Sequence, residues 1–420
     1  MTTNQTTNQK VLIVGAGVAG LASAIELKNL GWDVTVIERA PERRRGGYFI
    51  ALMPTGVAPA RRMGILDKMP NRQPKNAQTF TVTRNGKTTP GAGYAGASGT
   101  GGFEFRSLLR GDVENALYTS LPEGINILFG TTVTSIRQEN QKAYATLRST
   151  LKDASAKEHT EEYDLILGAD GVNSSIRKMV FGPDANYVNE LGYMVAASLA
   201  TKPLATADST NSYAFTEPGR AVWTFPFEGE TPSIMFTYRT DDIAGERAKG
   251  ATAALRTEFL EGKEESAFLS ELIDDFEAAD DKLFDSAKQV QMKQWYNGRV
   301  ALIGDAAWCL TLYSGLGVST GIAGANLLGN LLHENPSLDE VLPIWNARML
   351  EYVADQQQDV LAEGRSFFVP ADTKEYLMSK LLKEAISIPP VKKTLTATRL
   401  QKIAQKKGVD VADPSVPLPH

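Results

Sequence analysis

Cysteine and histidine are scarce in this chain of 420 residues, and their scarcity excludes several kinds of site. The single cysteine, Cys309, cannot form an internal disulfide, which fits a reducing compartment such as the cytoplasm. The only histidines are His159, His333 and His420, so neither a His/Cys zinc site nor a Ser-His-Asp hydrolase is favoured.

Excess positive charge and long apolar runs are also lacking. The formal net charge of −5 argues against nucleic acid as the main partner, because phosphate binding needs clustered Lys and Arg. The first ten residues are polar and lack the apolar core of a targeting segment. Residues 306–332 carry no charge but contain five glycines, which favours a buried loop and helix over a membrane span. We therefore expect a cytoplasmic protein without stable membrane insertion.

What remains is an ordinary globular composition, with 42% apolar and 8% aromatic residues. The length suggests two to three domains. Residues 11–14 form a short apolar run typical of a strand buried on both faces. Helical spacing follows over residues 21–30 and ends at Gly31, and residues 34–37 form a second apolar strand. This order predicts a βαβ unit.

A glycine motif joins the first strand to the helix. Gly15, Gly17 and Gly20 have the spacing of a dinucleotide-binding loop, and Glu38 follows 18 residues beyond Gly20. Gly15 permits a tight turn, Gly17 lets a pyrophosphate approach the backbone, and Gly20 allows close packing of helix and strand. The helix N-terminus offers free N–H groups to phosphates, and Glu38 can accept a bond from a ribose hydroxyl.

A second motif, late in the chain, indicates which dinucleotide binds. A strand-like run ends at Gly304 and Asp305, and Gly315 and Gly317 precede a helix rich in small residues. A carboxylate at a strand end can hold a ribityl hydroxyl, and a helix N-terminus can stabilise negative charge on a reduced flavin. Because NAD needs no such second element, the sequence favours FAD.

Between these motifs the sequence predicts several further elements. Helices are expected over residues 55–68 and 108–121, and strands over 78–105 with a hairpin turn at Asn85 and Gly86. A glycine-rich loop occupies residues 91–102. The remaining expectations are strands at 125–129, 132–136, 143–147, 165–167 and 300–303, a strand-rich and aromatic region at 186–240, an acidic helical region at 257–285, and helices from 353 onward.

Three motifs in this order resemble those of the single-component, FAD-dependent aromatic monooxygenases of the para-hydroxybenzoate hydroxylase fold. The first is the glycine motif with Glu38, the second runs from Gly168 through Asp170 to Arg177, and the third is Gly304 with Asp305. The resemblance implies that Asp305 binds the FAD ribitol and that Asp170 fixes the loop between flavin and pyridine nucleotide. It also assigns a cofactor contact to Arg106, with a plain surface arginine as the alternative.

The predicted site follows from these motifs. Glu38 and Arg39 are placed at the adenosine ribose, and the basic run 43–45 is either a phosphate contact or solvated surface charge. The aromatic strand residues Trp223, Phe225, Phe236 and Tyr238 are candidates for a substrate pocket, although alternation along strands predicts that about half are core. The predicted FAD contacts are Gly15, Gly17, Val18, Ala19, Gly20, Glu38, Arg39, Arg45, Gly46, Gly47, Arg106, Asp170, Asp305, Gly315, Gly317 and Val318. No catalytic residue and no metal site is predicted.

A narrower resemblance concerns residues 44–48 and the run from Cys309 to Gly317. Both are similar to the branch that contains the tetracycline-inactivating and polyketide-tailoring flavin monooxygenases. That resemblance implies a large multi-ring substrate and a helical C-terminal extension across the substrate cavity. The sequence departs from the pattern at Trp308, Leu312 and Ala51, which we expect near the flavin ring.

The predicted fold class is α/β, with a Rossmann-like FAD-binding domain, an inserted β-sheet substrate domain and a C-terminal helical segment. The FAD-binding domain takes residues 1–75, 103–180 and 292–352. The substrate domain takes residues 76–102 and 181–291, and the helical segment takes 353–420. We expect a monomer or homodimer.

The resemblance implies a monooxygenase that uses NAD(P)H and O2 to hydroxylate an aromatic or polyketide-like molecule, such as an antibiotic, through a C4a-hydroperoxyflavin. The hard chemistry belongs to the cofactor, which is consistent with the absence of an evident catalytic dyad. One alternative is a flavin oxidoreductase that transfers hydride without oxygen insertion. Another is a membrane-surface protein that uses its basic C-terminal segment.

Overall fold

The computed structural model describes residues 9–43, 46–91, 104–151, 158–359, 369–387 and 406–418. The glycine-rich loop predicted at 91–102 lies outside the described residues except for Gly91. The predicted FAD contact Arg45 also lies outside them.

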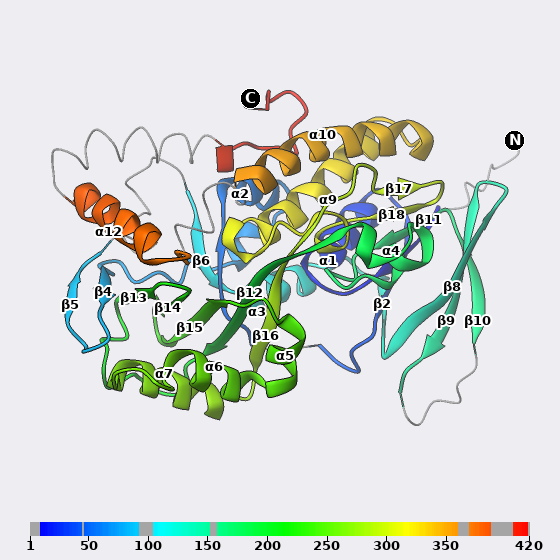
Figure 1. The fold of residues 1–420 in the computed structure, drawn as a ribbon. Coiled ribbons are helices and arrows are strands. Elements are labelled where there is room, and N and C mark those ends of the chain that lie inside the picture. The colour runs from blue at the N-terminus through cyan, green and yellow to red at the C-terminus, as the bar shows by residue number, and fades with distance from the viewer. Residues whose placement is uncertain are drawn as a thin grey trace, which may run out of the picture.

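A sheet of mainly parallel strands forms the centre of the dinucleotide-binding part (Figure 1). Its order is β17-β18-β11-β1-β2-β7, and only the edge strand β17 is antiparallel. Residues 11–14 and 165–168 are buried, as their continuous apolar character predicts for central parallel strands. The strands are β1 (Lys10–Val14), β2 (Asp33–Glu38), β7 (Asn126–Phe129), β11 (Leu165–Gly168), β17 (Tyr296–Asn297) and β18 (Val300–Leu302).

Small residues allow two helices to pack closely beside this sheet. These are α1 (Val18–Asn29) and α9 (Gly317–Glu334), and α10 (Leu338–Asp359) packs on α9. A Cβ added at Gly321 would lie 3.5 Å from the Cβ of Ala19, so the helices touch nearly backbone to backbone. The uncharged run 306–332 is thus a buried loop and helix, and no helix among the described ranges is long and apolar enough to cross a membrane.

A second sheet of seven strands has the order β16-β12-β15-β14-β13-β4-β5. One face shares the larger hydrophobic cluster with the parallel sheet, and the other face packs against α6 and α7 in a second cluster. Figure 1 shows α5, α6 and α7 along the side of this sheet that is remote from α9 and α10. The elements are β4 (Thr79–Val82), β5 (Thr88–Pro90), β12 (Val188–Leu199), β13 (Ser212–Glu217), β14 (Arg220–Phe227), β15 (Glu230–Arg239), β16 (Lys282–Val290), α5 (Ile243–Lys249), α6 (Ala251–Phe259) and α7 (Ala267–Ala278).

The other elements connect or flank these two sheets. A two-stranded sheet pairs β3 with β6, and a three-stranded antiparallel sheet has the order β10-β9-β8. The elements are β3 (Phe49–Leu52), α2 (Pro54–Arg62), η1 (Leu66–Lys68), β6 (Arg106–Leu109), α3 (Arg110–Tyr118), β8 (Thr131–Glu139), β9 (Lys142–Ser149), β10 (His159–Tyr163), α4 (Ser175–Val180), η2 (Asp184–Asn186), α8 (Asp305–Trp308), η3 (Leu312–Ser314) and α12 (Thr373–Ser387).

The mixed α/β fold class is confirmed, but several predicted helix limits are wrong. The helix expected from residue 108 begins at Arg110, because Leu108 and Leu109 pair with Ile50 and Phe49 as strand β6. The helix expected over 55–68 stops at Arg62, and the chain turns through Gly64 at φ 69°. The acidic region 257–285 comprises the end of α6, all of α7 and the start of β16 rather than continuous helix.

The hairpin predicted at Asn85 and Gly86 is present, since β4 pairs antiparallel with β5 and Gly86 has φ 79°. All strands of the seven-stranded sheet come from the two segments 79–90 and 188–290. The boundary expected at residue 353 falls inside α10, which continues to Asp359.

Candidate FAD site

The carboxyl ends of four parallel strands bring the predicted motifs to one edge of the first sheet. The glycine loop follows β1, Glu38 ends β2, Asp170 follows β11, and Asp305 follows β18. Backbone bonds hold these ends in register, including Gly15 N to Ile37 O and Ala169 N to Val14 O, both 2.8 Å. Ligands of open parallel sheets bind at this edge, where strand order reverses on either side of β1.

The three glycines of the loop differ in what surrounds them. A Cβ at Gly15, which has φ 112°, would overlap the carbonyl of Ala169, and a Cβ at Gly20 would overlap the carbonyl of Gly15. Gly17 has no heavy atom within 4 Å of such a Cβ. Gly15 and Gly20 are therefore needed for packing, whereas the space beside Gly17, at the start of α1, is open and fits an approaching pyrophosphate.

Glu38 binds the glycine loop itself. Its carboxylate accepts hydrogen bonds from Ala16 N at 3.0 Å and from Ala40 N at 2.8 Å. A carboxylate has about four acceptor positions, so a ribose hydroxyl can still be bound. The neighbouring Arg39 is exposed, and Val18 and Ala19 lie partly exposed in the first turn of α1.

Asp170 caps helix α4. Its carboxylate accepts bonds from Ser175 N at 2.6 Å, Ser175 Oγ at 2.9 Å and Ile176 N at 3.2 Å. These bonds satisfy N–H groups that the helix leaves free at its N-terminus. Asp170 therefore stabilises the N-terminus of α4 at this edge of the sheet.

Arg177 connects that cap to the segment that carries Asp305. Its guanidinium is fully buried and donates to Ala306 O at 2.9 Å and Val172 O at 2.7 Å. It also forms an ion pair with Asp184 at 2.7 Å. Because Ala306 directly follows Asp305, this arginine fixes the second and third motifs relative to each other.

We expect Arg177→Met to lower the free energy of unfolding by roughly 2–4 kcal/mol, because the carbonyl groups of Ala306 and Val172 and the Asp184 carboxylate lose a charged donor. Thermal or denaturant unfolding of the apoprotein measures this loss. Lys178→Met is the matched control, since exposed Lys178 also contacts Asp184 at 2.9 Å. That control should change stability by less than about 1 kcal/mol; an equal loss in both variants would contradict the role of Arg177.

Asp305 lies where the protein surrounds an accessible recess. Asp305 and Gly317 are exposed, although residues 301–304 and 306–311 are buried. A Cβ at Gly317 would lie 3.8 Å from Oδ1 of Asp305, so the starts of α8 and α9 face each other. Burial by the surrounding protein raises the pKa of the Asp305 carboxyl, and the charge of Arg110 opposes that shift. An accessible but poorly solvated carboxylate fits a site for a bound hydroxyl group.

Arg110, which the sequence analysis missed, approaches this carboxylate. It begins α3, and its charge acts on both Asp305 and the Tyr48 hydroxyl. Arg106 instead sits on strand β6 and donates to Leu66 O and Met69 O, both at 2.7 Å. The expected cofactor contact of Arg106 stays a prediction, since its guanidinium holds η1 in this structure and Arg110 is the arginine whose charge reaches Asp305.

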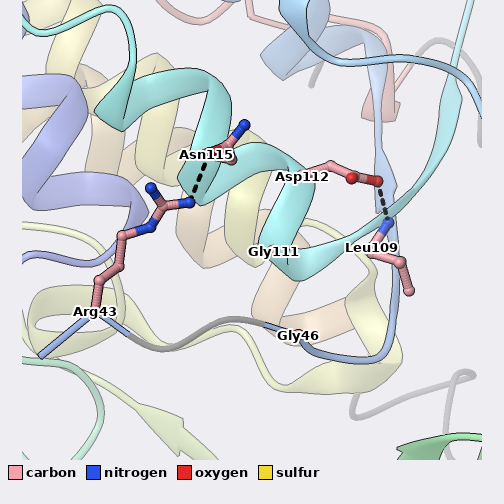
Figure 2. Close-up of a pocket in the computed structure, with 6 residues that line it drawn as sticks. All are labelled: Arg43, Gly46, Leu109, Gly111, Asp112 and Asn115. Carbon is pink, nitrogen blue, oxygen red and sulfur yellow. Dashed lines mark hydrogen bonds between the residues drawn. The ribbon is translucent and has the colours of Figure 1, made fainter.

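The Gly46–Gly47 segment crosses the start of α3. A Cβ at Gly47 would lie 3.0 Å from the Cβ of Arg110, and a Cβ at Gly111 would lie 2.6 Å from Gly46 O. Beside this crossing is a pocket of about 340 Å³, shown in Figure 2. On its wall Arg43 donates to Asn115 Oδ1 at 2.8 Å. The pocket is lined by Arg43, Gly46, Leu109, Gly111, Asp112 and Asn115.

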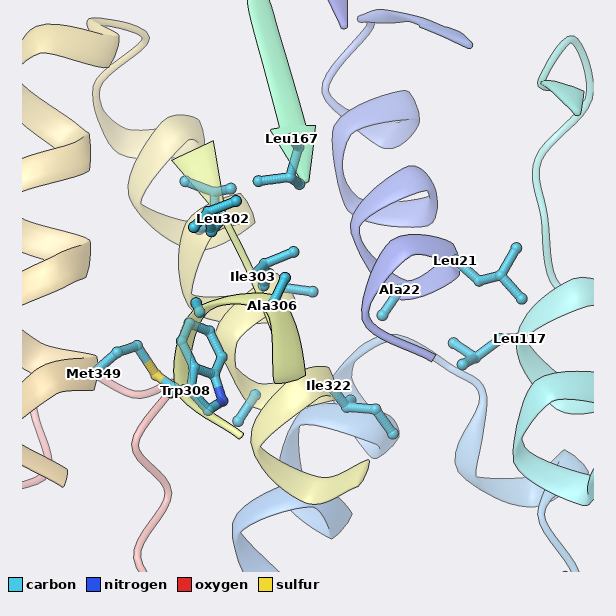
Figure 3. Packing of buried hydrophobic residues seen from close by; sticks show 14 of the residues in the cluster. Leu21, Ala22, Leu117, Leu167, Leu302, Ile303, Ala306, Trp308, Ile322 and Met349 are labelled. Carbon is cyan, nitrogen blue, oxygen red and sulfur yellow. The ribbon is translucent and has the colours of Figure 1, made fainter. Parts of the chain in front are cut away.

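The loop before α9 supplies Gly315 and the first turn of α9 supplies Val318, both partly exposed beside Gly317. Trp308, expected near the flavin ring, points instead into the core, as Figure 3 shows beside Met349. Its ring centroid lies 4.7 Å from that of Trp295, and its Nε1 donates to Thr320 Oγ1 at 3.2 Å. Hydrophobic packing thus explains this tryptophan.

Leu312 and Ala51, the other two departures from the family pattern, differ in exposure. Leu312 begins η3 and is partly exposed at the edge of the larger core. Ala51 is buried in β3. Of the three departures, Leu312 is therefore the one that the structure leaves accessible.

The four aromatic candidates for the substrate pocket divide between the two faces of the seven-stranded sheet. Trp223 and Phe225 lie on the face shared with the parallel sheet, where Phe225 stacks on Phe49 with centroids 4.0 Å apart. Phe236 and Tyr238 face the helices. Both are buried, which fits the expectation that about half of the four aromatic residues belong to the core.

Specific contacts account for the burial of those two side chains. Phe236 packs edge-on against Phe259 and Phe276, with centroids 5.5 and 5.9 Å away. The Tyr238 hydroxyl donates to Glu246 at 2.7 Å, and burial together with that carboxylate raises the pKa of the phenol. Both residues therefore stabilise the sheet against α5–α7.

A contact between Tyr313 and Thr237 at the shared face was not predicted. Tyr313, from the loop before α9, bonds Thr237 of β15 at 2.5 Å, and its ring meets Tyr193 edge-on at 5.5 Å. These contacts tie the predicted flavin-side loop to the second sheet. Sequence spacing contains no signal for them, since residues 76 positions apart are joined only by the fold.

Across the described ranges, no group of three or more His, Cys, Asp or Glu residues could hold a metal ion. The arrangement instead offers the groups that a dinucleotide needs: an open glycine turn at a helix start, a ribose acceptor, and a carboxylate with an arginine in a recess.

Comparison with known proteins agrees with this geometry. A family model described as an FAD binding domain matches residues 8–336. The FAD-dependent monooxygenase asL4 of Sarocladium schorii is 31% identical over 331 residues, covering 76% of this chain and 74% of asL4.

Solved structures share the fold. The crystal structure of the tetracycline destructase Tet(51) has a TM-score of 0.74 at 23% identity and covers 98% of this chain and 100% of its own. HpxO of Klebsiella pneumoniae, solved with FAD and uric acid, has a TM-score of 0.72 at 20% identity and covers 93% and 97%. With the family model matching most of its length and a relative above 30% identity, the chain belongs to the FAD-dependent monooxygenases that contain this FAD binding domain.

Proposed function

We propose that this protein hydroxylates an aromatic or polyketide-like small molecule with O2, using FAD as cofactor and NADPH or NADH as transient co-substrate. The observation that carries the proposal is the sheet edge, where the open turn at Gly17 and the exposed Asp305 lie at the carboxyl ends of β1 and β18. Family membership supplies the reaction class.

The residues present fit FAD in three places. The turn at Gly17 and the N-terminus of α1 would bind the pyrophosphate, and Glu38 would bind the adenosine ribose. Asp305, with Arg110 beside it, would bind the ribityl chain. Gly315, Gly317 and Val318, at the start of α9, would meet the flavin, where free N–H groups favour negative charge.

When bound, FAD supplies the redox chemistry of hydride acceptance and oxygen activation. The protein binds and orients the cofactor and the substrate, and it excludes water from the reacting groups. The buried segment 306–311 closes one side of the recess, and the Tyr313–Thr237 bond holds the loop against the second sheet. The start of α9 would stabilise negative charge on the reduced ring.

An apolar, multi-ring substrate is favoured by the aromatic side chains on the shared face. Trp223 and Phe225 extend from β14 on this face, and Phe225 stacks on Phe49 of β3. Large apolar surfaces with few polar groups bind ring systems. Tet(51) is named a tetracycline destructase and HpxO was solved with uric acid, so ring substrates occur on this fold.

The finer organisation belongs to the same proposal. We place the FAD-binding domain at residues 1–75, 103–180 and 292–352, and the substrate domain at 76–102 and 181–291, with residues from 353 as a C-terminal addition. The protein would act in the cytoplasm as a monomer or homodimer.

The test is NAD(P)H consumption by FAD-loaded protein with a panel of phenols, quinolones, tetracyclines and anthraquinones, under 18O2. We expect a compound that accelerates consumption and gains one labelled oxygen atom. Oxidised product without label would contradict the proposal and favour a flavin oxidoreductase that transfers hydride only. Trp308 gives that alternative no support, because its side chain packs in the core.

A further inference from the structure

The C-terminal residues 406–418 form a strap across α2, α9 and α10, seen in red beside α10 in Figure 1. Thr55 and Arg62 of α2 bond to Val409 O and to the Asp410 carboxylate, and Arg348 of α10 donates to Val411 O at 2.8 Å. Val411 and Ala412 are fully buried. The strap is therefore docked on α2, α10 and α9, and the first turn of α9 belongs to the proposed FAD site.

Two adjacent lysines of the strap have different environments. Lys406 forms ion pairs with Asp355 and Asp359 of α10, at 3.1 and 3.0 Å. Lys407 instead donates from Nζ to the carbonyl of Ser314 at 2.6 Å. Among the described residues no ion pair involves Lys407, and burial lowers its pKa to about 8 although Asp359 opposes the shift.

The loop that receives this ammonium has an unusual backbone. Thr311 has φ 69° and ψ 157°, a region that β-branched residues rarely occupy. Its Oγ1 is buried without a hydrogen-bond partner in the described part of the chain. Such a conformation persists only where surrounding contacts impose it.

Contacts from outside the loop help to impose that conformation. The hydroxyl of Tyr313 bonds Thr237, Gln357 Nε2 lies 3.5 Å from Cys309 O, and Val290 N donates to Cys309 O at 3.0 Å. Lys407 adds a charged donor, and it acts on Ser314, immediately before Gly315. The loop continues directly into Gly317 beside Asp305.

We propose that Lys407 is a positioning residue, which holds loop 311–317 from the C-terminal strap in the conformation that receives the flavin. The inference rests on the proposed function in that it requires FAD at this edge of the sheet. It gives the C-terminal segment a role in cofactor binding through a single ammonium group.

The test is titration of apoprotein with FAD, followed by flavin fluorescence, for wild type, Lys407→Ala and Lys406→Ala. We expect Lys407→Ala to raise the FAD dissociation constant about tenfold, the effect of losing one charged hydrogen bond. Lys406→Ala keeps the contact between Lys407 and the loop, and it should change the FAD dissociation constant less than about twofold. The visible circular dichroism of bound flavin should change in Lys407→Ala alone.

Chemical rescue separates the ammonium from a general effect on folding. In Lys407→Ala, n-propylammonium should restore FAD affinity at constant ionic strength, whereas tetramethylammonium should not. Equal effects of the two substitutions, or no rescue, would overturn the proposal. Wild type that binds FAD but oxygenates nothing would refute only the proposed function, while wild type that binds no FAD would refute both.

Discussion

Replacing Arg110 with glutamine is expected to lower FAD affinity roughly 10- to 100-fold, the effect of losing a charged hydrogen-bond donor in a poorly solvated site. Arg110 begins α3 beside Tyr48, and its charge reaches the Asp305 carboxylate. Fluorescence titration of the apoprotein with FAD measures the change.

Arg106→Gln is the matched control. Arg106 lies on the neighbouring strand β6, and its guanidinium donates to Leu66 O and Met69 O. That substitution should lower the free energy of unfolding by about 1–3 kcal/mol, since two acceptors lose their donor, and leave FAD affinity near wild type. A larger loss of affinity from Arg106→Gln than from Arg110→Gln would contradict the assignment made from the structure.

Gly17→Ala is expected to lower FAD affinity about 100-fold or more, equivalent to about 2.7 kcal/mol, while the apoprotein folds almost normally. An added Cβ meets no protein atom within 4 Å, and Gly17 has φ −81°, which alanine adopts freely. The new methyl group would instead occupy the space proposed for the pyrophosphate. Apoprotein unfolding and FAD titration, measured together, test both parts.

Gly15→Ala should behave in the opposite way. Its Cβ would overlap the carbonyl of Ala169, and φ 112° is unfavourable for alanine. We expect the apoprotein to lose more than about 1 kcal/mol of stability before any ligand is added. If Gly17→Ala bound FAD as wild type does, the pyrophosphate would have to lie elsewhere.

Local patterns explain why much of the site was predictable from sequence. The glycine turn, Glu38 and the Gly304–Asp305 pair are each specified within a few residues of a buried apolar strand. Parallel pairing of β2, β1, β11 and β18 then places all of them at one edge without further information. The three motifs consequently identified the family and the fold class.

Non-local pairing explains what the sequence could not show. Residues 106–109 look like the start of a helix until Phe49–Leu52 is available to pair with them, and that pairing places Arg106 on β6 and Arg110 at the start of α3. Alternation along β14 and β15 predicts two faces but not which face the helices cover, so the sequence could not assign Phe236 and Tyr238 to the core. The Lys407–Ser314 contact joins residues 93 positions apart.

Equilibrium dialysis of purified apoprotein against FAD tests the central claim most directly. The account predicts one FAD bound per chain, and loss of that binding in Gly17→Ala while the variant unfolds at nearly the wild-type temperature. A folded wild-type protein that binds no flavin at saturating FAD would contradict the assignment of the sheet edge as the cofactor site.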